Sequence, residues 1–176
     1  MLRNRMIAAA LGLAAMAQPT LARADECISE PEIAAMAIYA MPSLITSVSN
    51  FCAPHLPATG YLASEGAALS SRYAEVRADS WPLAKTALLK LAASGRTADK
   101  EREIFAQLPD EALQPLVDAI IVQKLAADMK PGDCGRIERG VRIFAPLPPE
   151  NTGELIAFVI SMAKSDKMPV CRQDPS

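Results

Sequence analysis

The stretch between Cys27 and Cys52 constrains the fold of this chain more than any other part of the sequence. Ser29, followed three residues later by Glu32, fits a capping box at the start of a helix. Pro42 removes one helical hydrogen bond, but the apolar spacing continues through it, so we expect one bent helix and not two. The apolar residues recur three or four positions apart for about five turns: Ile33, Met36, Ala37, Ala40, Met41, Leu44, Ile45, Val48 and Phe51.

This helix limits how the four cysteines can pair. A helix of about 20 residues is ~30 Å long, whereas a disulfide needs Cα atoms within about 7 Å of each other. Cys27 therefore cannot bond to Cys52 unless Pro42 folds the helix back on itself, and if all four cysteines pair, Cys134 then cannot bond to Cys171. Two pairings remain: Cys52–Cys134 with Cys27–Cys171, or Cys27–Cys134 with Cys52–Cys171. Both join the first helix to the C-terminal third of the chain.

The N-terminal sequence predicts export. A positively charged start, an apolar run over residues 6–17 and small residues at Ala22 and Ala24 have the arrangement of a Sec-type signal peptide. We expect residues 1–24 to be cleaved after Ala24, which leaves residues 25–176 as a single periplasmic or secreted domain. Disulfides form and persist in such oxidising compartments.

Charge and hydropathy narrow the choice of partners. Without the three arginines of the predicted signal peptide, the 18 basic residues of the chain fall to 15 against 20 acidic ones, a net charge of about −5. Such a chain lacks the basic surface of nucleic-acid-binding proteins, and we expect no nucleic-acid partner. Residues 155–163 form the apolar candidate for a membrane span, and they are too few to cross one. We therefore expect no membrane insertion after cleavage.

The rest of the chain also has helical spacing, and no stretch alternates with the two-residue period of a strand. Prolines, Ser94-Gly95 and Pro131-Gly132 separate the helices. Including the first, the expected helices cover residues 29–52, 59–78, 80–94, 97–108, 134–144 and 151–163, and a further helix begins between residues 110 and 115 and ends near residue 129. We predict an all-α bundle of six or seven mostly antiparallel helices, cross-linked by two disulfides. If the helices alternate in direction, Cys52 and Cys134 reach the same end, which favours the pairing Cys52–Cys134 with Cys27–Cys171.

Two finer expectations concern individual helices. Ser80 is the expected N-cap of the helix over residues 80–94, and Asn151 with Glu154 resembles a capping box for the last helix. The last helix is apolar on nearly every side, which is typical of a helix surrounded by others, so we expect it at the centre of the bundle. Its apolar residues are Leu155, Ile156, Phe158, Val159, Ile160 and Met162.

Motifs for catalysis and metal binding are scarce. The chain has one histidine, His55, and no Cys-x-x-Cys or His-x-x-x-His spacing, so we expect neither a metal nor a cofactor. Ser161 and Lys164 match Ser-x-x-Lys, but the partner motifs of that enzyme class are absent. An enzyme is therefore not favoured, and a hydrolase with an unrecognised site is the third hypothesis for function.

One surface feature suggests a binding role. Arg136, Arg139 and Arg142 share one side of the helix over residues 134–144 and form a candidate interaction patch for an acidic partner. The alternative is a solvated face on which Glu138 pairs with Arg142. His55 and Tyr61, in and after a proline-rich loop, are two further candidate contact residues.

The leading functional hypothesis is a non-catalytic exported protein-interaction module, such as an inhibitor that neutralises a partner. The alternative is a carrier of a small apolar ligand held between helices, because the last helix is apolar on so many sides.

Overall fold

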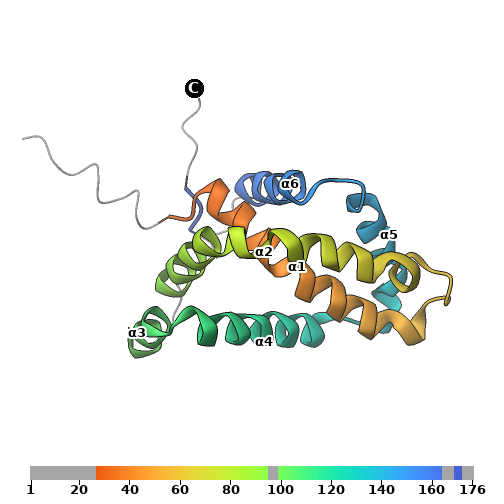
Figure 1. Ribbon diagram of the computed structural model, residues 1–176, viewed down its shortest axis with the longest axis horizontal. Helices are drawn as coiled ribbons and strands as arrows, with labels where there is room; N and C mark the ends of the chain where they lie inside the picture. The colour runs from red at the N-terminus through yellow and green to blue at the C-terminus, as the bar shows by residue number, and fades with distance from the viewer. Residues whose placement is uncertain (1–26, 95–98, 164–168, 172–176) are drawn as a thin grey trace, which may run out of the picture.

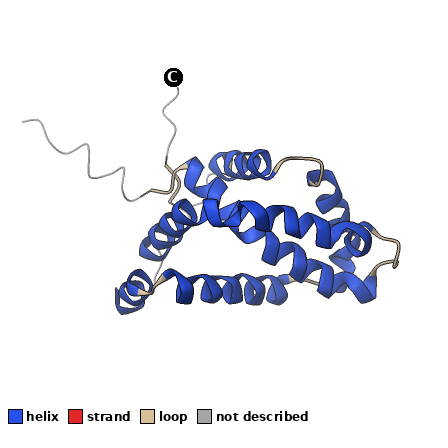
Figure 2. Cartoon of the chain, in the orientation of Figure 1, coloured by secondary structure: helices blue, strands red, loops and turns tan. Residues whose placement is uncertain are grey.

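The computed structural model describes residues 27–94, 99–163 and 169–171, and within these residues it is all helical apart from loops and one isolated bridge. Figure 2 shows this helical content, and Figure 1 shows how the helices are arranged. The elements are α1 (Glu30–Cys52), η1 (Ala53–His55), α2 (Tyr61–Ser94), α3 (Asp99–Gln107), α4 (Asp110–Asp128), η2 (Pro131–Asp133), α5 (Cys134–Phe144) and α6 (Pro149–Met162). The predicted all-α bundle is confirmed.

Helix α1 is the central element, because it packs along α2 and also contacts α4, α5 and α6. It runs through Pro42 as a single helix, as the apolar spacing predicted. The capping box is present: the backbone N–H of Ser29 donates to Glu32 Oε2 at 2.7 Å. Figure 1 shows α4 and α6 on opposite edges of the α1–α2 pair.

Both favoured disulfides are present. Cys27–Cys171 joins the two ends of the described chain, and Cys52–Cys134 joins the end of α1 to the start of α5. Next to the first disulfide, Ile28 forms a parallel bridge with Val170. The Cys171 N–H donates to the Ile28 carbonyl at 3.0 Å, so backbone bonds reinforce the covalent link.

The expected break near Ser80 is wrong, because α2 is one helix from Tyr61 to Ser94. The Ser80 hydroxyl does not cap a new helix but donates to the Val76 carbonyl one turn earlier, at 3.0 Å. Pro82 lies inside the helix, where it removes a single backbone bond. The buried Trp81 ring lies 4.8 Å from the Tyr39 ring of α1, and this packing holds the helix together across the proline.

The expected central position of the last helix is also wrong. Helix α6 lies at an edge of the bundle, where Phe158 and Val159 are more than half exposed, at 55% and 56%. Its buried face consists of Pro149, Thr152, Gly153 and Ala157. Small residues let α6 approach α1 closely, and Ile160 packs against the core at the edge of this contact. The other large apolar residues Leu155, Phe158, Val159 and Met162 are exposed. The helix also begins earlier than expected, with Pro148 as N-cap, so Asn151 is not its cap.

Among the described residues, one segment is long and apolar enough to cross a membrane. It consists of α1 and η1 (Glu30–His55), and its most apolar window has a mean hydropathy of 1.3. Half of its most apolar window is buried inside the bundle, and a buried core helix gives the same signal. The predicted signal peptide lies outside the described residues.

Candidate functional site

A groove of about 660 Å³ lies between α1, α2 and α6. The N-terminal half of α1, the middle of α2 and the part of α6 from Glu150 to Phe158 form its walls. Its apolar lining includes Ala34, Ala35, Ile38, Val76, Leu83, Ala157 and Phe158. Its volume lies within the range of about 300–1,000 Å³ that is typical of binding sites.

Close contact between α6 and α1 sets the shape of this groove. A Cβ placed on Gly153 of α6 would lie 2.8 Å from the Ile38 side chain and 2.9 Å from the Ala34 carbonyl oxygen. Glycine is therefore required where the two helices meet. Ala34 and Ile38 also line the groove, so this contact positions part of its lining.

Four carboxylate residues also line the groove, and no Lys, Arg or His residue of the described part of the chain does. Glu30 comes from α1, Asp79 from α2, and Glu150 and Glu154 from α6. Glu30 and Glu150 lie in the first turns of their helices, where the helix dipole stabilises negative charge. Asp79 and Glu154 lie further along their helices and have no such stabilisation.

Glu30 adds a second observation about the electrostatics of this groove. Its Oε1 atom is buried and has no hydrogen-bond partner within the described part of the chain. A buried carboxylate oxygen without a donor is unfavourable, because it has lost water without gaining a protein bond. The groove thus combines an apolar lining with carboxylates that no basic side chain of the lining neutralises.

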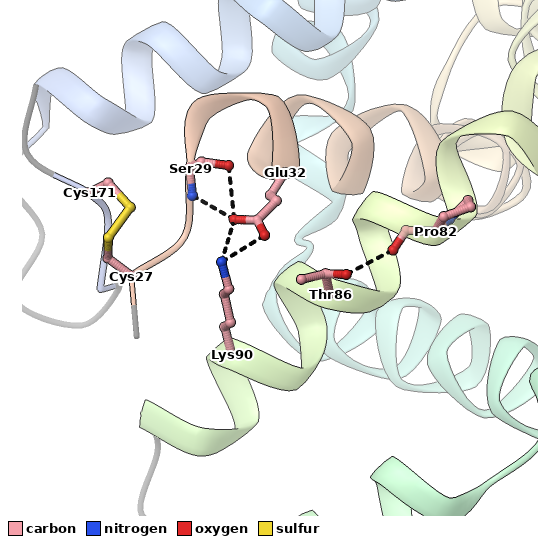
Figure 3. A network of polar contacts seen from close by, with 7 residues as sticks. All are labelled: Cys27, Ser29, Glu32, Pro82, Thr86, Lys90 and Cys171. Atoms are coloured by element: carbon pink, nitrogen blue, oxygen red, sulfur yellow. Dashed lines mark hydrogen bonds and ion pairs between the residues drawn. A yellow bond between two sulfur atoms is a disulfide. The ribbon is translucent and has the colours of Figure 1, made fainter. Parts of the chain in front are cut away.

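The nearby carboxylate of Glu32 is different, because it is neutralised within the fold (Figure 3). Lys90 Nζ donates to its two oxygens at 2.7 and 3.0 Å, and the Ser29 hydroxyl donates at 2.9 Å. Burial by itself would raise the pKa of Glu32, but the bonds from Lys90 and Ser29 outweigh burial and lower it below its ordinary value of 4.5. Glu32 thus joins α1 to α2, beside the Cys27–Cys171 disulfide, and is not available to a ligand.

A second polar cluster lies between α1, α2 and α4. Arg77 donates to Asp118 Oδ1 at 2.5 Å, and the Ser43 hydroxyl donates to the same oxygen at 3.0 Å. The Arg77 guanidinium lies 4.1 Å from the centre of the Tyr39 ring, and burial raises the pKa of the Tyr39 hydroxyl. None of these residues lines the groove. The cluster holds α4 against the central pair of helices, and we assign it a structural role.

The three arginines of the predicted interaction patch are exposed on α5. Arg136 forms an ion pair with Asp133, while Arg139 and Arg142 make no ion pair within the described residues. The alternative pairing of Glu138 with Arg142 is not found. Glu138 Oε1 instead accepts a hydrogen bond from the Leu62 backbone N–H at 3.1 Å and stabilises the start of α2.

The two loop residues of the predicted patch occupy different environments. His55 is exposed at the end of η1, with its ring 6.0 Å from that of Phe51. Tyr61 is half-buried as the first residue of α2 and packs against a core cluster to which Val141 of α5 also belongs. Among the described residues, no hydrogen bond, ion pair or ring contact joins His55 to the three arginines, and the five residues stay a predicted interaction patch.

The residues considered for catalysis and metal binding lie in different settings. No group of three or more His, Cys, Asp or Glu side chains there is arranged to hold a metal ion. All four cysteines are in disulfides. The Ser161 hydroxyl donates to the Phe158 carbonyl at 2.9 Å, and Lys164 lies outside the described residues.

Comparison of the chain with models of protein families, with curated proteins and with solved structures finds no match. Any assignment of function must therefore come from the geometry of the molecule itself.

Sequence reasoning missed the groove. Its carboxylates lie on three helices, from Glu30 to Glu154, and only the packing of α6 against α1 brings these helices together. The one signal in the sequence is the pair Glu150 and Glu154, one helical turn apart, followed by Phe158 one turn later. That pattern is also typical of an ordinary solvated helix face.

Proposed function

We propose that this chain is an exported, non-catalytic protein-interaction module that takes a segment of a partner protein into the groove between α1, α2 and α6. The observation that carries this proposal is the combination of an apolar lining with four carboxylates and, among the described residues, no basic side chain. Two features of the sequence support export: the signal-peptide pattern over residues 1–24, and four cysteines that all form disulfides.

Exposed apolar side chains at the groove favour a protein partner. Leu83 of α2 and Phe158 of α6 both line the groove, and their exposed fractions are 48% and 55%. Exposed apolar side chains that gather into one patch often mark a protein-interaction site. The exposed arginines of α5 line no part of the groove, so they are at most a second contact region for an acidic partner.

The carrier of a small apolar ligand is the second candidate. A cavity of about 90 Å³ between α1, α2 and α5 is lined entirely by apolar and aromatic side chains, among them Ile45, Leu69 and Tyr73. It is far smaller than the groove, and its volume suits only a very small molecule. This observation keeps the carrier hypothesis open but ranks it below the interaction module.

Site-specific cross-linking tests the proposal. A photoreactive amino acid replaces Leu83 in the groove, and in a matched variant it replaces Val122 of α4, which is exposed to a similar degree, 41%. In the exporting cell we expect one defined protein adduct from position 83 and none of that mass from position 122. Equal labelling from both positions would contradict a docking site at the groove.

Native mass spectrometry of gently purified protein separates the two candidates. A small-molecule mass that is lost on denaturation would support the carrier. Protein without such a mass, together with the adduct at position 83, would support the interaction module.

A further inference from the structure

We propose that the partner segment is a basic amphipathic helix, which places Lys or Arg side chains over the carboxylates of the groove and apolar side chains on its lining. This inference rests on the proposed function and adds the chemical class of the partner. It follows from the charge of the groove, the shape of its walls and the apolar surface beside it.

Charge is the first argument. One groove is lined by Glu30, Asp79, Glu150 and Glu154, and no Lys, Arg or His of residues 27–94, 99–163 and 169–171 lines it. Like charges in a recess with apolar walls repel one another and produce a focused negative potential. A cationic segment relieves this repulsion and supplies a donor for the unpartnered Oε1 atom of Glu30. An acidic partner or an anionic membrane surface would increase the repulsion.

Backbone conformation is the second argument. An extended peptide binds most often by adding a strand to a sheet edge, and the described residues contain one isolated bridge, Ile28–Val170, and no sheet. A polyproline segment needs a groove rich in aromatic residues, and Phe158 is the one aromatic residue of this lining. A helix in a groove between helices is the remaining common mode of peptide recognition. Glu150 and Glu154 are one turn apart and match basic residues one turn apart on a partner helix.

The surface of α6 beside the groove is the third argument. Phe158 lines the groove and also belongs to an exposed stripe with Leu155 and Met162, three and four residues away. Val159 adjoins this stripe and is 56% exposed. A small organic cation would fill the groove and leave the stripe uncovered. The apolar face of a partner helix can cover both.

A designed peptide tests the charge and conformation together. The probe is a synthetic 18-residue amphipathic helix of Lys and Leu, and its matched control has Glu in place of every Lys. Each is titrated into the oxidised chain over residues 25–176 by calorimetry, with circular dichroism to follow the helix content of the peptide. We expect the Lys peptide to bind at least about tenfold more tightly than the Glu peptide and to become helical on binding.

Charge-reversal variants locate the binding. In Glu150→Lys/Glu154→Lys, two groove carboxylates change sign, and we expect affinity for the Lys peptide to fall by at least about tenfold. The control Glu65→Lys/Glu75→Lys makes the same change in net charge at two exposed residues of α2 that do not line the groove. Affinity should change far less in this control. An equal loss in both variants would show binding to net charge alone and would overturn the proposal.

Two further outcomes would also overturn it. Binding of the peptide without a gain in helix content would exclude the helical mode. Self-association of the free chain in sedimentation, abolished by Glu150→Lys/Glu154→Lys, would make a second copy the occupant, since α5 itself carries three arginines beside the exposed Ile143.

Failure of this inference differs from failure of the proposed function. If position 83 still cross-links one defined protein but the Lys peptide does not bind, the groove is a docking site for a partner of another chemical class. If position 83 gives no defined adduct, the proposed function itself fails.

Discussion

Gly153 of α6 lies so close to Ile38 of α1 that a Cβ on the glycine would be 2.8 Å from two carbons of the isoleucine side chain. The Ala34 carbonyl oxygen would be only 2.9 Å away, and a backbone atom cannot move aside as a side chain can. This contact fixes α6 on α1 and thereby positions one wall of the groove.

We therefore expect Gly153→Ala to lower the free energy of unfolding by about 1–3 kcal/mol, because the added methyl group forces α6 away from α1. Gly140→Ala is the matched control: Gly140 is also in a helix, but nothing lies within 4 Å of its added Cβ. The better helix propensity of alanine should make that variant more stable by about 0.5–1 kcal/mol. Urea denaturation measures both, and a stabilised Gly153→Ala would show that the two helices are not in close contact.

Glu32→Gln tests the ion pair between α1 and α2. Glu32 has a pKa below 4.5 in the folded chain, so in the unfolded chain it takes up a proton first as the pH falls. Its contribution to stability is fully present above about pH 4.5 and is lost as the pH falls through the lower folded pKa. At about pH 7 we expect Glu32→Gln to cost about 1–3 kcal/mol, because the Lys90 ammonium loses its charged partner.

The cost of Glu32→Gln should shrink at about pH 3, where the unfolded chain no longer holds this carboxyl ionised. Urea denaturation at both pH values provides the comparison. Glu75→Gln, at an exposed residue of α2, should leave stability almost unchanged at either pH. A cost for Glu32→Gln that does not vary with pH would mean that packing, and not charge, accounts for the role of Glu32.

Loss of either disulfide should lower stability by about 2–5 kcal/mol. Cys27–Cys171 closes the longer loop, with a sequence separation of 144 against 82, but loop length alone accounts for only about 0.5 kcal/mol of difference. Cys52 and Cys134 are almost completely buried beside Val48, so their removal also leaves a cavity in the core.

We therefore expect the double variant Cys52→Ala/Cys134→Ala to be less stable than Cys27→Ala/Cys171→Ala. Thermal denaturation of the oxidised proteins under identical conditions ranks the two variants. The reverse ranking would show that loop closure, and not core packing, decides the contribution of each bridge.

Local signals predicted the centre of the fold well. The capping box of Ser29 and Glu32 and the regular apolar spacing depend only on neighbours in the sequence, and both predicted α1. The length of that helix then excluded a Cys27–Cys52 bond, and the alternating direction of the helices favoured the pairing that the structure contains.

Features that depend on contacts between distant parts of the chain could not be predicted from the sequence. Pro82 is a helix breaker by local propensity, and only the packing of Trp81 on Tyr39 shows why α2 continues through it. The sequence of α6 shows that most of its sides are apolar, but not which side is covered. Gly153 and Ala157, which do contact α1, are too small to mark a buried face in a hydrophobicity pattern. The groove was missed for the same reason, because α6 forms one of its walls.

A glutamate on each of two sides of α6 tests its position at the edge of the bundle. Val159 is 56% exposed and Ala157 only 2%, so Val159→Glu should change the free energy of unfolding by no more than about 0.5 kcal/mol. Ala157→Glu would bury a charge without a partner, and we expect a loss of at least about 3 kcal/mol. Thermal denaturation, monitored by circular dichroism, compares the stability of the two variants. Similar losses of unfolding free energy in both variants would show that α6 lies inside the bundle, as its apolar sequence alone predicts. The apolar stripe beside the groove would then not be exposed.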